Sequence, residues 1–221
     1  MEKFIHVDRC DSTQDLLKEQ LTQSGNEALT ISCEQQLNGR GRGGNTWLDS
    51  PGTICFSMAL APHGKPTFTA LELSTLVADF FKQKGVALKL KWPNDLLTRE
   101  EKKCGGILVQ NSGSHFLAGV GLNLFQTSDD FGGVYETSFP FEKKSWSQEL
   151  SRFIRAHRYG STEDLIRSWT DYCYHLNREV RIIEGTEETR GQFVGLGTFG
   201  EALIENSTGT HHLYNGSLRL V

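Results

Sequence analysis

Residues 35–47 read Gln35-Gln36-Leu37-Asn38-Gly39-Arg40-Gly41-Arg42-Gly43-Gly44-Asn45-Thr46-Trp47. The four glycines predict a loop rather than a helix, because glycine costs about 1 kcal/mol at each helical position. Without Cβ atoms, the backbone can approach a ligand closely and its amides can point at an anion. Arg40 and Arg42 add planar donors that match carboxylate or phosphate oxygens. The run therefore predicts a mobile loop that closes over an anionic small molecule, with the flat ring of Trp47 at its end.

Three other interpretations fit parts of this loop. A solvated glycine-rich linker accounts for the composition alone. Gly39, Gly41 and Gly44 match the G-x-G-x-x-G dinucleotide fingerprint. That fingerprint must open a helix, whereas residues 45–52 have the composition of a turn. An RNA-binding Arg-Gly segment would repeat within a basic chain, and this one occurs once in a chain of net charge −4.

The overall composition narrows the class of protein. A chain of 221 residues, 37% of them hydrophobic, suits one sizeable domain with a smaller one beside it. The net charge argues against a general nucleic-acid binder. No apolar run is long enough to cross a bilayer, and residues 1–6 lack the apolar core of a signal peptide. Five cysteines without a C-x-x-C pair are typical of reduced thiols, so we expect a cytoplasmic protein with no membrane partner.

The hydrophobic pattern changes twice along the chain. Apolar alternation and buried runs predict strands over residues 4–7, 28–33, 53–60, 88–92, 103–110 and 116–124. Helices are expected from Ser12 onwards and over residues 68–84, and two more between residues 145 and 173. The last forty or so residues read as short strands separated by turns, which suggests a small barrel of the SH3 type. We therefore expect an α+β protein with a catalytic domain at residues 1–176 and an SH3-like domain at residues 177–221.

Two further segments place polar groups beside the predicted sheet. Pro93 cannot donate a hydrogen bond within a sheet, so the strand ends or kinks there and leaves Asn94 and Asp95 at its margin. Ordinary turn chemistry also explains that pair. Lys103 begins the return strand and is followed by two glycines, which places a cation where the backbone can approach a ligand. Glycines at alternate positions of residues 116–124 leave one face of the next strand bare.

Five motifs stand in order along the chain: Ser12-Thr13-Gln14, Gln36-x-x-Gly39-Arg40-Gly41-Arg42-Gly43-Gly44-Asn45-x-Trp47, Lys91-Trp92-Pro93-Asn94-Asp95, Lys103-x-Gly105-Gly106-Ile107-Leu108 and Gly119-x-Gly121-x-Asn123. Together they resemble the biotin protein ligases, or holocarboxylase synthetases, over essentially the whole chain. The resemblance implies a mixed sheet with flanking helices, related to class II aminoacyl-tRNA synthetases, before the SH3-like barrel. The sequence departs from many bacterial members at Gly43 and Asn45, where those members carry arginines.

The resemblance implies a reaction in two steps. Biotin and ATP give biotinyl-5′-AMP and pyrophosphate, and a lysine of a biotin carboxyl carrier protein then attacks the mixed anhydride. In the first step a carboxylate approaches an anionic phosphate, so fixed cations must offset the repulsion. Loop closure must also keep water away from the anhydride. Mg²⁺ is expected to arrive with ATP, because the sequence shows no dedicated protein metal cage.

The resemblance also assigns roles to individual residues. Catalytic roles fall to Arg40, Lys103 and Asp95. Asp95 either orients or deprotonates the acceptor lysine, or it anchors the loop. The residues expected to bind biotin are Ser12, Thr13, Gln14, Gln36, Gly39, Arg40, Gly41, Lys103 and Gly105. Those expected to bind ATP or the adenylate are Arg40, Arg42, Trp47, Asn94, Lys103 and Asn123, with Trp47 packed on adenine.

The resemblance also implies the binding partners of the protein and leaves two alternative functions. Some family members carry an N-terminal DNA-binding winged helix, but Ser12-Thr13-Gln14 lies so near the start of this sequence that we expect a short form without DNA binding. The expected partner is a biotin carboxyl carrier domain, for example that of acetyl-CoA carboxylase, and either a monomer or a homodimer is compatible. The alternatives are a lipoate–protein ligase and a non-catalytic module that binds biotin or a nucleotide. The loop at residues 39–42 favours the biotin branch.

Overall fold

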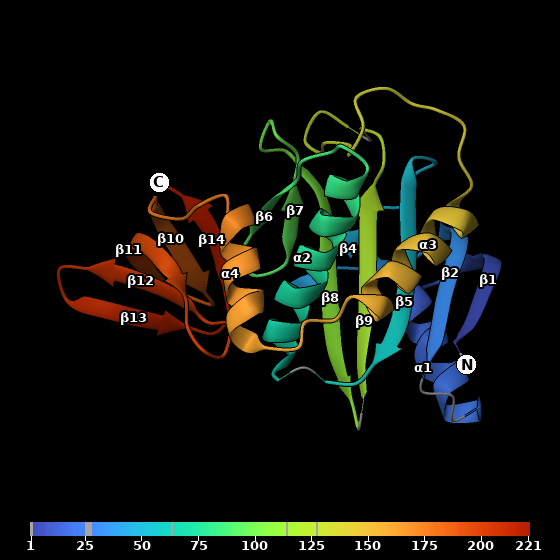
Figure 1. Cartoon of the computed structure of the whole chain (residues 1–221), viewed down its shortest axis with the longest axis horizontal. Coiled ribbons are helices and arrows are strands. Elements are labelled where there is room, and N and C mark those ends of the chain that lie inside the picture. Colours follow the sequence, from blue (N-terminus) through green and yellow to red (C-terminus); the bar gives the residue numbers. More distant parts are fainter. Residues whose placement is uncertain (1, 25–27, 63, 114, 127) are drawn as a thin grey trace.

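The computed structural model describes residues 2–221 apart from residues 25–27, 63, 114 and 127. Within these residues the chain forms a large seven-stranded sheet, a five-stranded sheet and a two-stranded hairpin, with four α-helices (Figure 1). The five-stranded sheet comes last in the chain and lies at one end of the large sheet. The predicted α+β class, with a large mixed sheet, flanking helices and a small C-terminal β-unit, is confirmed.

The large sheet is mixed. Only its first two neighbouring strands run parallel; every other neighbouring pair is antiparallel. Its strands follow the spatial order β1 (Lys3–Cys10), β2 (Leu29–Gln36), β5 (Thr53–Leu60), β9 (His115–Asn123), β8 (Lys103–Ser112), β7 (Asp95–Leu97) and β6 (Lys89–Lys91). Because β5 and β9 are central, the residues that they carry lie at the middle of the molecule.

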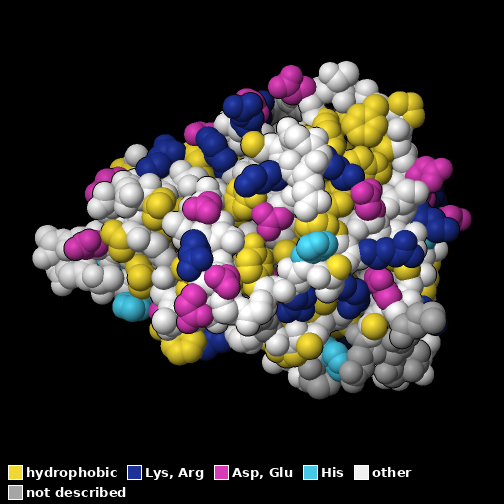
Figure 2. Space-filling view, viewed as in Figure 1, with side chains coloured by type: hydrophobic (Ala, Val, Ile, Leu, Met, Phe, Trp, Pro, Cys, Tyr) yellow, Lys and Arg dark blue, Asp and Glu magenta, His cyan; other side chains and the backbone are white. Residues whose placement is uncertain are grey.

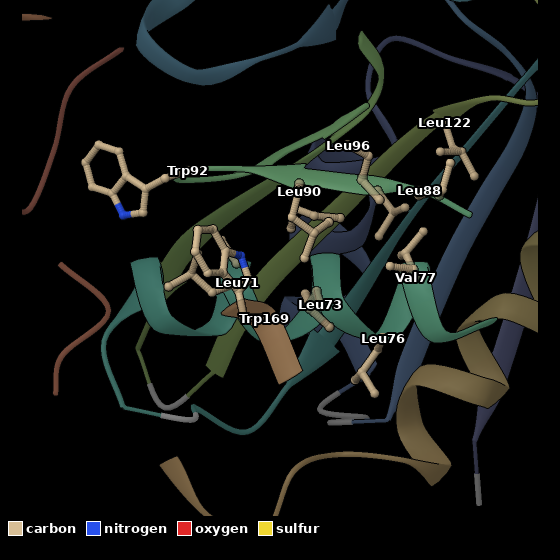
Figure 3. Packing of buried hydrophobic residues seen from close by; sticks show 14 of the residues in the cluster. Leu71, Leu73, Leu76, Val77, Leu88, Leu90, Trp92, Leu96, Leu122 and Trp169 are labelled. Atoms are coloured by element: carbon tan, nitrogen blue, oxygen red, sulfur yellow. The ribbon is translucent and has the colours of Figure 1, made fainter. Parts of the chain in front are cut away.

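Helices cover the two faces of this sheet unequally. On β5, Phe56 and Met58 join the main buried cluster together with leucines of α2 (Pro66–Gln83) and α3 (Lys143–Ala156), which lie in front of the sheet in Figure 1. The leucines of α2 pack against those of β6, β7 and the chain just before them (Figure 3). Ala59 instead packs with Leu17 of α1 (Thr13–Ser24), because successive strand residues face opposite sides. Even-numbered residues of β5 therefore face α2 and α3, and odd-numbered residues face α1.

The C-terminal sheet is antiparallel and packs on the same core. Its strands follow the order β13 (Gly209–Leu213), β12 (Ala202–Asn206), β11 (Glu187–Leu196), β10 (Glu179–Glu184) and β14 (Ser217–Leu220). Phe193 and Ile204 belong to one buried cluster with Trp169 of α4 (Thr162–Tyr172). The indole of Trp92 donates a hydrogen bond to Gly200 O at 3.1 Å. The small sheet is thus fixed to the edge of the large one, whereas a domain boundary between residues 176 and 177 stays a prediction.

The glycine-rich loop folds into a compact hairpin. Its two short strands, β3 (Gly39–Arg40) and β4 (Thr46–Trp47), pair antiparallel, and a 3₁₀ turn (Arg42–Gly44) joins them. Gly43 and Gly44 have φ angles of 62° and 81°, a backbone conformation that glycine adopts at little cost. Residues 39–52 contain no α-helix, so the loop lacks the helix N-terminus that a dinucleotide fingerprint needs. The expected mobility of the loop stays a prediction.

Candidate active site beneath the glycine loop

A pocket of about 950 Å³ opens where the glycine hairpin crosses the face of the large sheet that carries α1. Residues from all five sequence motifs line it, including Gly119, Gly121 and Asn123 of the fifth. The predicted site residues that line the pocket are Ser12, Thr13, Gln14, Gln36, Arg40, Gly41, Arg42, Trp47, Asn94, Asp95, Lys103 and Asn123. Segments that are distant in the sequence are therefore brought together around one cavity.

The floor of the pocket comes from β5 and β9. Ser57 pairs with Gly119 and Cys55 pairs with Gly121 across these strands, and all four residues line the cavity. Burial raises the pKa of the Cys55 thiol, so the floor stays uncharged. The bare glycines leave room for a flat group, and the indole of Trp47 now lies directly on Gly121.

Neutral hydrogen-bonding groups occupy the wall nearest α1. Thr13 donates to Gln36 Oε1 through its backbone N–H at 2.8 Å and its hydroxyl at 3.1 Å. The Thr13 and Ser57 hydroxyls are 2.8 Å apart. Gln14 Nε2 donates to Leu117 O at 2.8 Å, which fixes that amide against β9. These donors and acceptors suit an uncharged polar ring such as a cyclic urea.

A carboxylate with two ammonium groups forms the opposite wall. Lys103 Nζ lies 2.6 Å from Asp95 Oδ1, and Lys91 Nζ lies 3.4 Å from Asp95 Oδ2. The Asp95 side chain is 17% exposed, so this cluster is partly shielded from water. Because Lys91, Asp95 and Lys103 come from three adjacent strands, β6, β7 and β8, rigid backbone fixes their relative positions.

The two loop arginines point in different directions. Arg42 donates to Asn94 Oδ1 at 3.2 Å, and Asn94 Nδ2 in turn donates to Ile107 O at 2.7 Å. Burial lowers the pKa of the Arg42 guanidinium, and the charge of Asp95 opposes that effect. Arg40 instead forms an ion pair with Asp15 of α1 at the rim, where both side chains are exposed. Arg42 is therefore the arginine that reaches towards the lysine cluster in this conformation.

Two predicted site residues do not line the pocket. A Cβ at Gly105 would meet Leu122 Cδ1 at 2.7 Å, so its open side faces the core, and its neighbour Gly106 lines the cavity instead. The register of β7 and β8 shifts after Leu96, which decides which glycine faces the site. A Cβ at Gly39 would come 2.5 Å from Trp47 O, so this glycine permits the tight hairpin. The biotin contacts predicted for Gly39 and Gly105 stay predictions.

The cavity also contains residues that the sequence analysis missed. Ser57 and Lys91 line it, and the pairing of Ser57 with the bare strand of Gly119 could have indicated the first. Residues 217–220 of β14 reach the same cavity. No local pattern marks that short strand as part of a site, because its role depends on how the C-terminal sheet packs.

The surface carries mixed charge. On the face shown in Figure 2, Lys and Arg side chains alternate with Asp and Glu, and no broad area of one sign is visible.

Among the helices in the described part of the chain, none combines the length and apolar character needed to cross a membrane.

Comparison with known proteins gives consistent matches. Residues 6–124 match the biotin/lipoate A/B protein ligase family, and residues 175–217 match the biotin protein ligase C-terminal domain. The chain is 25% identical over 252 residues to the bifunctional ligase/repressor BirA of Bacillus spizizenii, with 99% of this chain and 74% of that protein covered. It is 27% identical to the biotin–[acetyl-CoA-carboxylase] ligase of Paracoccus denitrificans, with 81% and 85% covered.

A solved structure extends the similarity to three dimensions. The biotin protein ligase from Aquifex aeolicus in complex with biotin and ATP superimposes with a TM-score of 0.84 at 26% sequence identity. The alignment covers 100% of both chains. The similarity therefore includes the large sheet, the glycine hairpin and the C-terminal sheet.

Proposed function

Because the chain belongs to the biotin/lipoate A/B protein ligase family and is a biotin protein ligase within it, we propose that its pocket makes biotinyl-5′-AMP and then transfers biotin to a carrier lysine. One observation supports this above all others. The cavity places neutral hydrogen-bonding groups (Thr13, Gln36) on one wall and cationic groups (Arg42, Lys103) on the other. Biotin has the same polarity, with an uncharged ureido ring at one end and a carboxylate at the other.

In the first step, a biotin carboxylate oxygen bonds to the α-phosphorus of ATP. The bond from that phosphorus to the bridging oxygen breaks, and pyrophosphate leaves with the bonding electrons. Lys103 and Arg42 offset the repulsion between the two anions. Arg40 joins them after it leaves Asp15, and Ser12, Thr13, Gln14, Gln36 and the backbone at Gly41 hold the ureido end. The ammonium group of Lys103 is already directed into the site by its 2.6 Å contact with Asp95.

In the second step, the amine of the carrier lysine attacks the biotinyl carbonyl carbon and AMP leaves. The attacking nitrogen must lose a proton, and Asp95 accepts it. Lys91 and Lys103 fix the position of this carboxylate from two sides, and its side chain stays 17% exposed. The same contacts give Asp95 a positioning role for Lys103 in the first step, whereas anchoring of the loop by Asp95 stays a prediction.

The nucleotide occupies the part of the pocket between the hairpin and the end of β9. Arg42 and Asn94 lie near the phosphates, Trp47 packs on the adenine, and Asn123 contacts the adenylate. Mg²⁺ enters the pocket bound to the phosphates of ATP, as part of that substrate. Among the described residues, no group of three His, Cys, Asp or Glu side chains is placed to hold an ion, so the protein ligands for Mg²⁺ are not assigned.

The protein partner is a biotin carboxyl carrier domain that presents one lysine. The choice between monomer and homodimer, the absence of DNA binding and the cytoplasmic location stay predictions.

Pyrophosphate–ATP exchange with the purified chain tests the proposal without a carrier protein. We expect exchange with biotin and none with lipoate. Exchange with lipoate but not with biotin would contradict the assignment of biotin as the substrate, although it would still agree with an adenylation reaction. A folded protein that supports exchange with neither acid would contradict the enzymatic proposal and favour a binding module.

A further inference from the structure

We propose that Lys143, which lies outside the pocket, is a positioning residue for biotin activation because it clamps both stems of the glycine hairpin. The inference rests on the proposed function, since it concerns how the same site is assembled. Lys143 is the first residue of α3, 94 residues after Asp49 in the chain. No sequence motif includes it.

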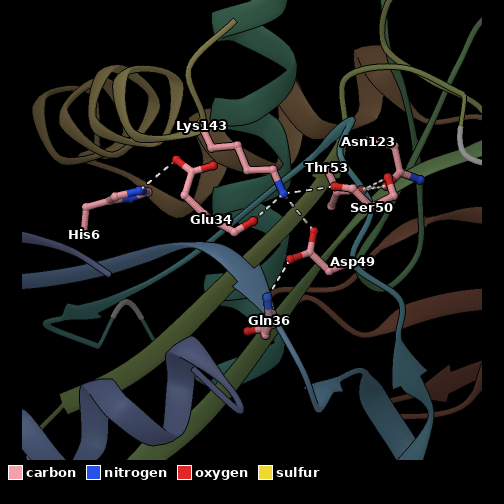
Figure 4. A network of polar contacts seen from close by, with 8 residues as sticks. All are labelled: His6, Glu34, Gln36, Asp49, Ser50, Thr53, Asn123 and Lys143. Atoms are coloured by element: carbon pink, nitrogen blue, oxygen red, sulfur yellow. Dashed lines mark hydrogen bonds and ion pairs between the residues drawn. The ribbon is translucent and has the colours of Figure 1, made fainter. Parts of the chain in front are cut away.

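All three ammonium protons of Lys143 have an acceptor (Figure 4). Nζ donates to Glu34 O at 2.7 Å, to Ser50 O at 3.0 Å and to Asp49 Oδ1 at 3.2 Å. Glu34 precedes the hairpin, and Asp49 and Ser50 follow it. One ammonium group therefore ties together the two ends of the segment that carries Arg40 and Arg42.

The position of Lys143 is unfavourable for the helix that carries it. A cation in the first turn of a helix opposes the helix dipole, and α3 has no acidic residue in its first turn. The Lys143 and Asp49 side chains are also only 9% and 4% exposed, and burying charge is costly unless it is paired. Helix stability therefore does not explain this lysine, whereas the three contacts to the hairpin stems do.

The clamp continues directly into the wall that faces the ureido ring. Asp49 uses its second oxygen, Oδ2, to accept the backbone N–H of Gln36 at 2.7 Å. The side chain of Gln36 then accepts both hydrogen bonds from Thr13. Lys143 thus fixes Asp49, Asp49 fixes the Gln36 backbone, and Gln36 fixes Thr13.

A second branch leads to the nucleotide side of the pocket. Lys143 holds the backbone oxygen of Ser50, and the Ser50 and Thr53 hydroxyls are 2.8 Å apart. The Thr53 hydroxyl donates to Asn123 Oδ1 at 2.9 Å. Loss of the ammonium group should therefore loosen both ends of the site, and the shorter branch to Gln36 should be affected more.

Steady-state exchange assays at saturating ATP, with biotin varied, test the clamp. We compare Lys143→Met, Asp49→Asn, the double variant and Arg158→Met with the unchanged chain. Arg158→Met is the matched control, because it breaks another ion pair with a buried partner, Arg158 Nη2–Glu72 Oε2 at 2.7 Å, whose residues do not line the pocket. Limited trypsin digestion with mass spectrometry gives a second readout, the rate of cleavage after Arg40 or Arg42 in the absence of ligand.

We expect Lys143→Met to raise the KM for biotin about tenfold or more, with a smaller change in kcat, and to speed cleavage in the hairpin. Asp49→Asn should act in the same direction, and the effect of the double variant should be smaller than the sum of the two single effects, because the contact between Lys143 and Asp49 is lost in each single variant. Arg158→Met should lower thermal stability and leave the KM and the first cleavage site unchanged. If Lys143→Met does not fold, Asp49→Asn decides the question.

The clamp is overturned if Lys143→Met and Asp49→Asn lose stability as Arg158→Met does but keep the KM for biotin within about twofold and show no faster cleavage in the hairpin. A failure of the proposed function has a different signature. In that case the unchanged chain shows no exchange with biotin, and the trypsin comparison alone still decides whether Lys143 holds the hairpin.

Discussion

The indole of Trp47 rests on the backbone of Gly121, and a Cβ at residue 121 would lie 2.5 Å from Trp47 Cε2. Real side chains do not tolerate such a contact, so the ring, and the hairpin strand that carries it, would have to move. The bare strand face and the loop tryptophan therefore form one surface. Its shape depends on the absence of a single methyl group.

We expect Gly121→Ala to displace Trp47 and to lower kcat/KM for ATP in the exchange assay by about tenfold or more. The physical reason is that the aromatic surface for adenine shifts while the cationic groups stay in place. Gly160→Ala is the control, because a Cβ there meets nothing within 4 Å. An unchanged kcat/KM in Gly121→Ala would show that the position of Trp47 does not matter for nucleotide binding.

Lys103→Ala should reduce the rate of exchange about 100-fold or more, because it removes a fixed cation from the developing charge. The free energy of unfolding should change by less than about 1 kcal/mol, since this lysine is 36% exposed and ion pairs of that kind contribute little. Exchange kinetics and denaturant unfolding measure the two effects. Lys102→Ala, at the neighbouring exposed position, should keep normal exchange; a rate within about threefold of normal in Lys103→Ala would remove Lys103 from the site.

Asp15→Asn should release Arg40 from its resting ion pair. Because both side chains are exposed, the pair is worth at most about 1 kcal/mol, and we expect the KM for biotin to fall by up to about fivefold. Glu149→Gln breaks a comparable surface pair with Lys84 and should not change this KM. A rise in the KM for biotin in Asp15→Asn would mean that the ion pair supports the bound state instead.

His175 should make the protein sensitive to acid. Its ring is fully buried against Phe193 and Trp169, and burial, aided by the charges of Lys91 and Arg178, lowers its pKa from 6.5 to about 3. The folded state therefore keeps the ring neutral while the unfolded chain takes up a proton below pH 6.5. Stability from this residue is complete above that pH and is lost as the pH falls towards 3. At pH 5 the loss is about 2 kcal/mol.

The variant His175→Phe tests this directly. We expect its free energy of unfolding to exceed that of the unchanged chain by more at pH 5 than at pH 8, because only the histidine can take up a proton when the chain unfolds. Urea unfolding at the two pH values gives the difference, and the pH 8 measurement isolates any change in packing. Equal differences at both pH values would contradict the assignment.

Much of the fold follows from local pattern. The buried run at residues 53–60 is the central strand β5, and the helix predicted at residues 68–84 is α2, observed at Pro66–Gln83. Residues 209–213 form the strand β13 although four of the five, including His211 and His212, are not apolar and they follow a turn sequence. Its partner β12 and the small sheet as a whole supply the stabilisation that the local sequence lacks.

The sequence alone determined the chemistry of the site. Glycines without side chains, arginines beside them, and a lysine before a Gly-Gly pair carry their function within a few neighbouring residues, so their pattern is readable without a structure. Only the tertiary structure decided which glycine lines the pocket, because a register shift between β7 and β8 favours Gly106 over Gly105. It also brought Lys143 to Asp49 across 94 residues. Contacts between residues so far apart in the sequence depend on how a helix packs against a sheet, and no local sequence pattern predicts that packing.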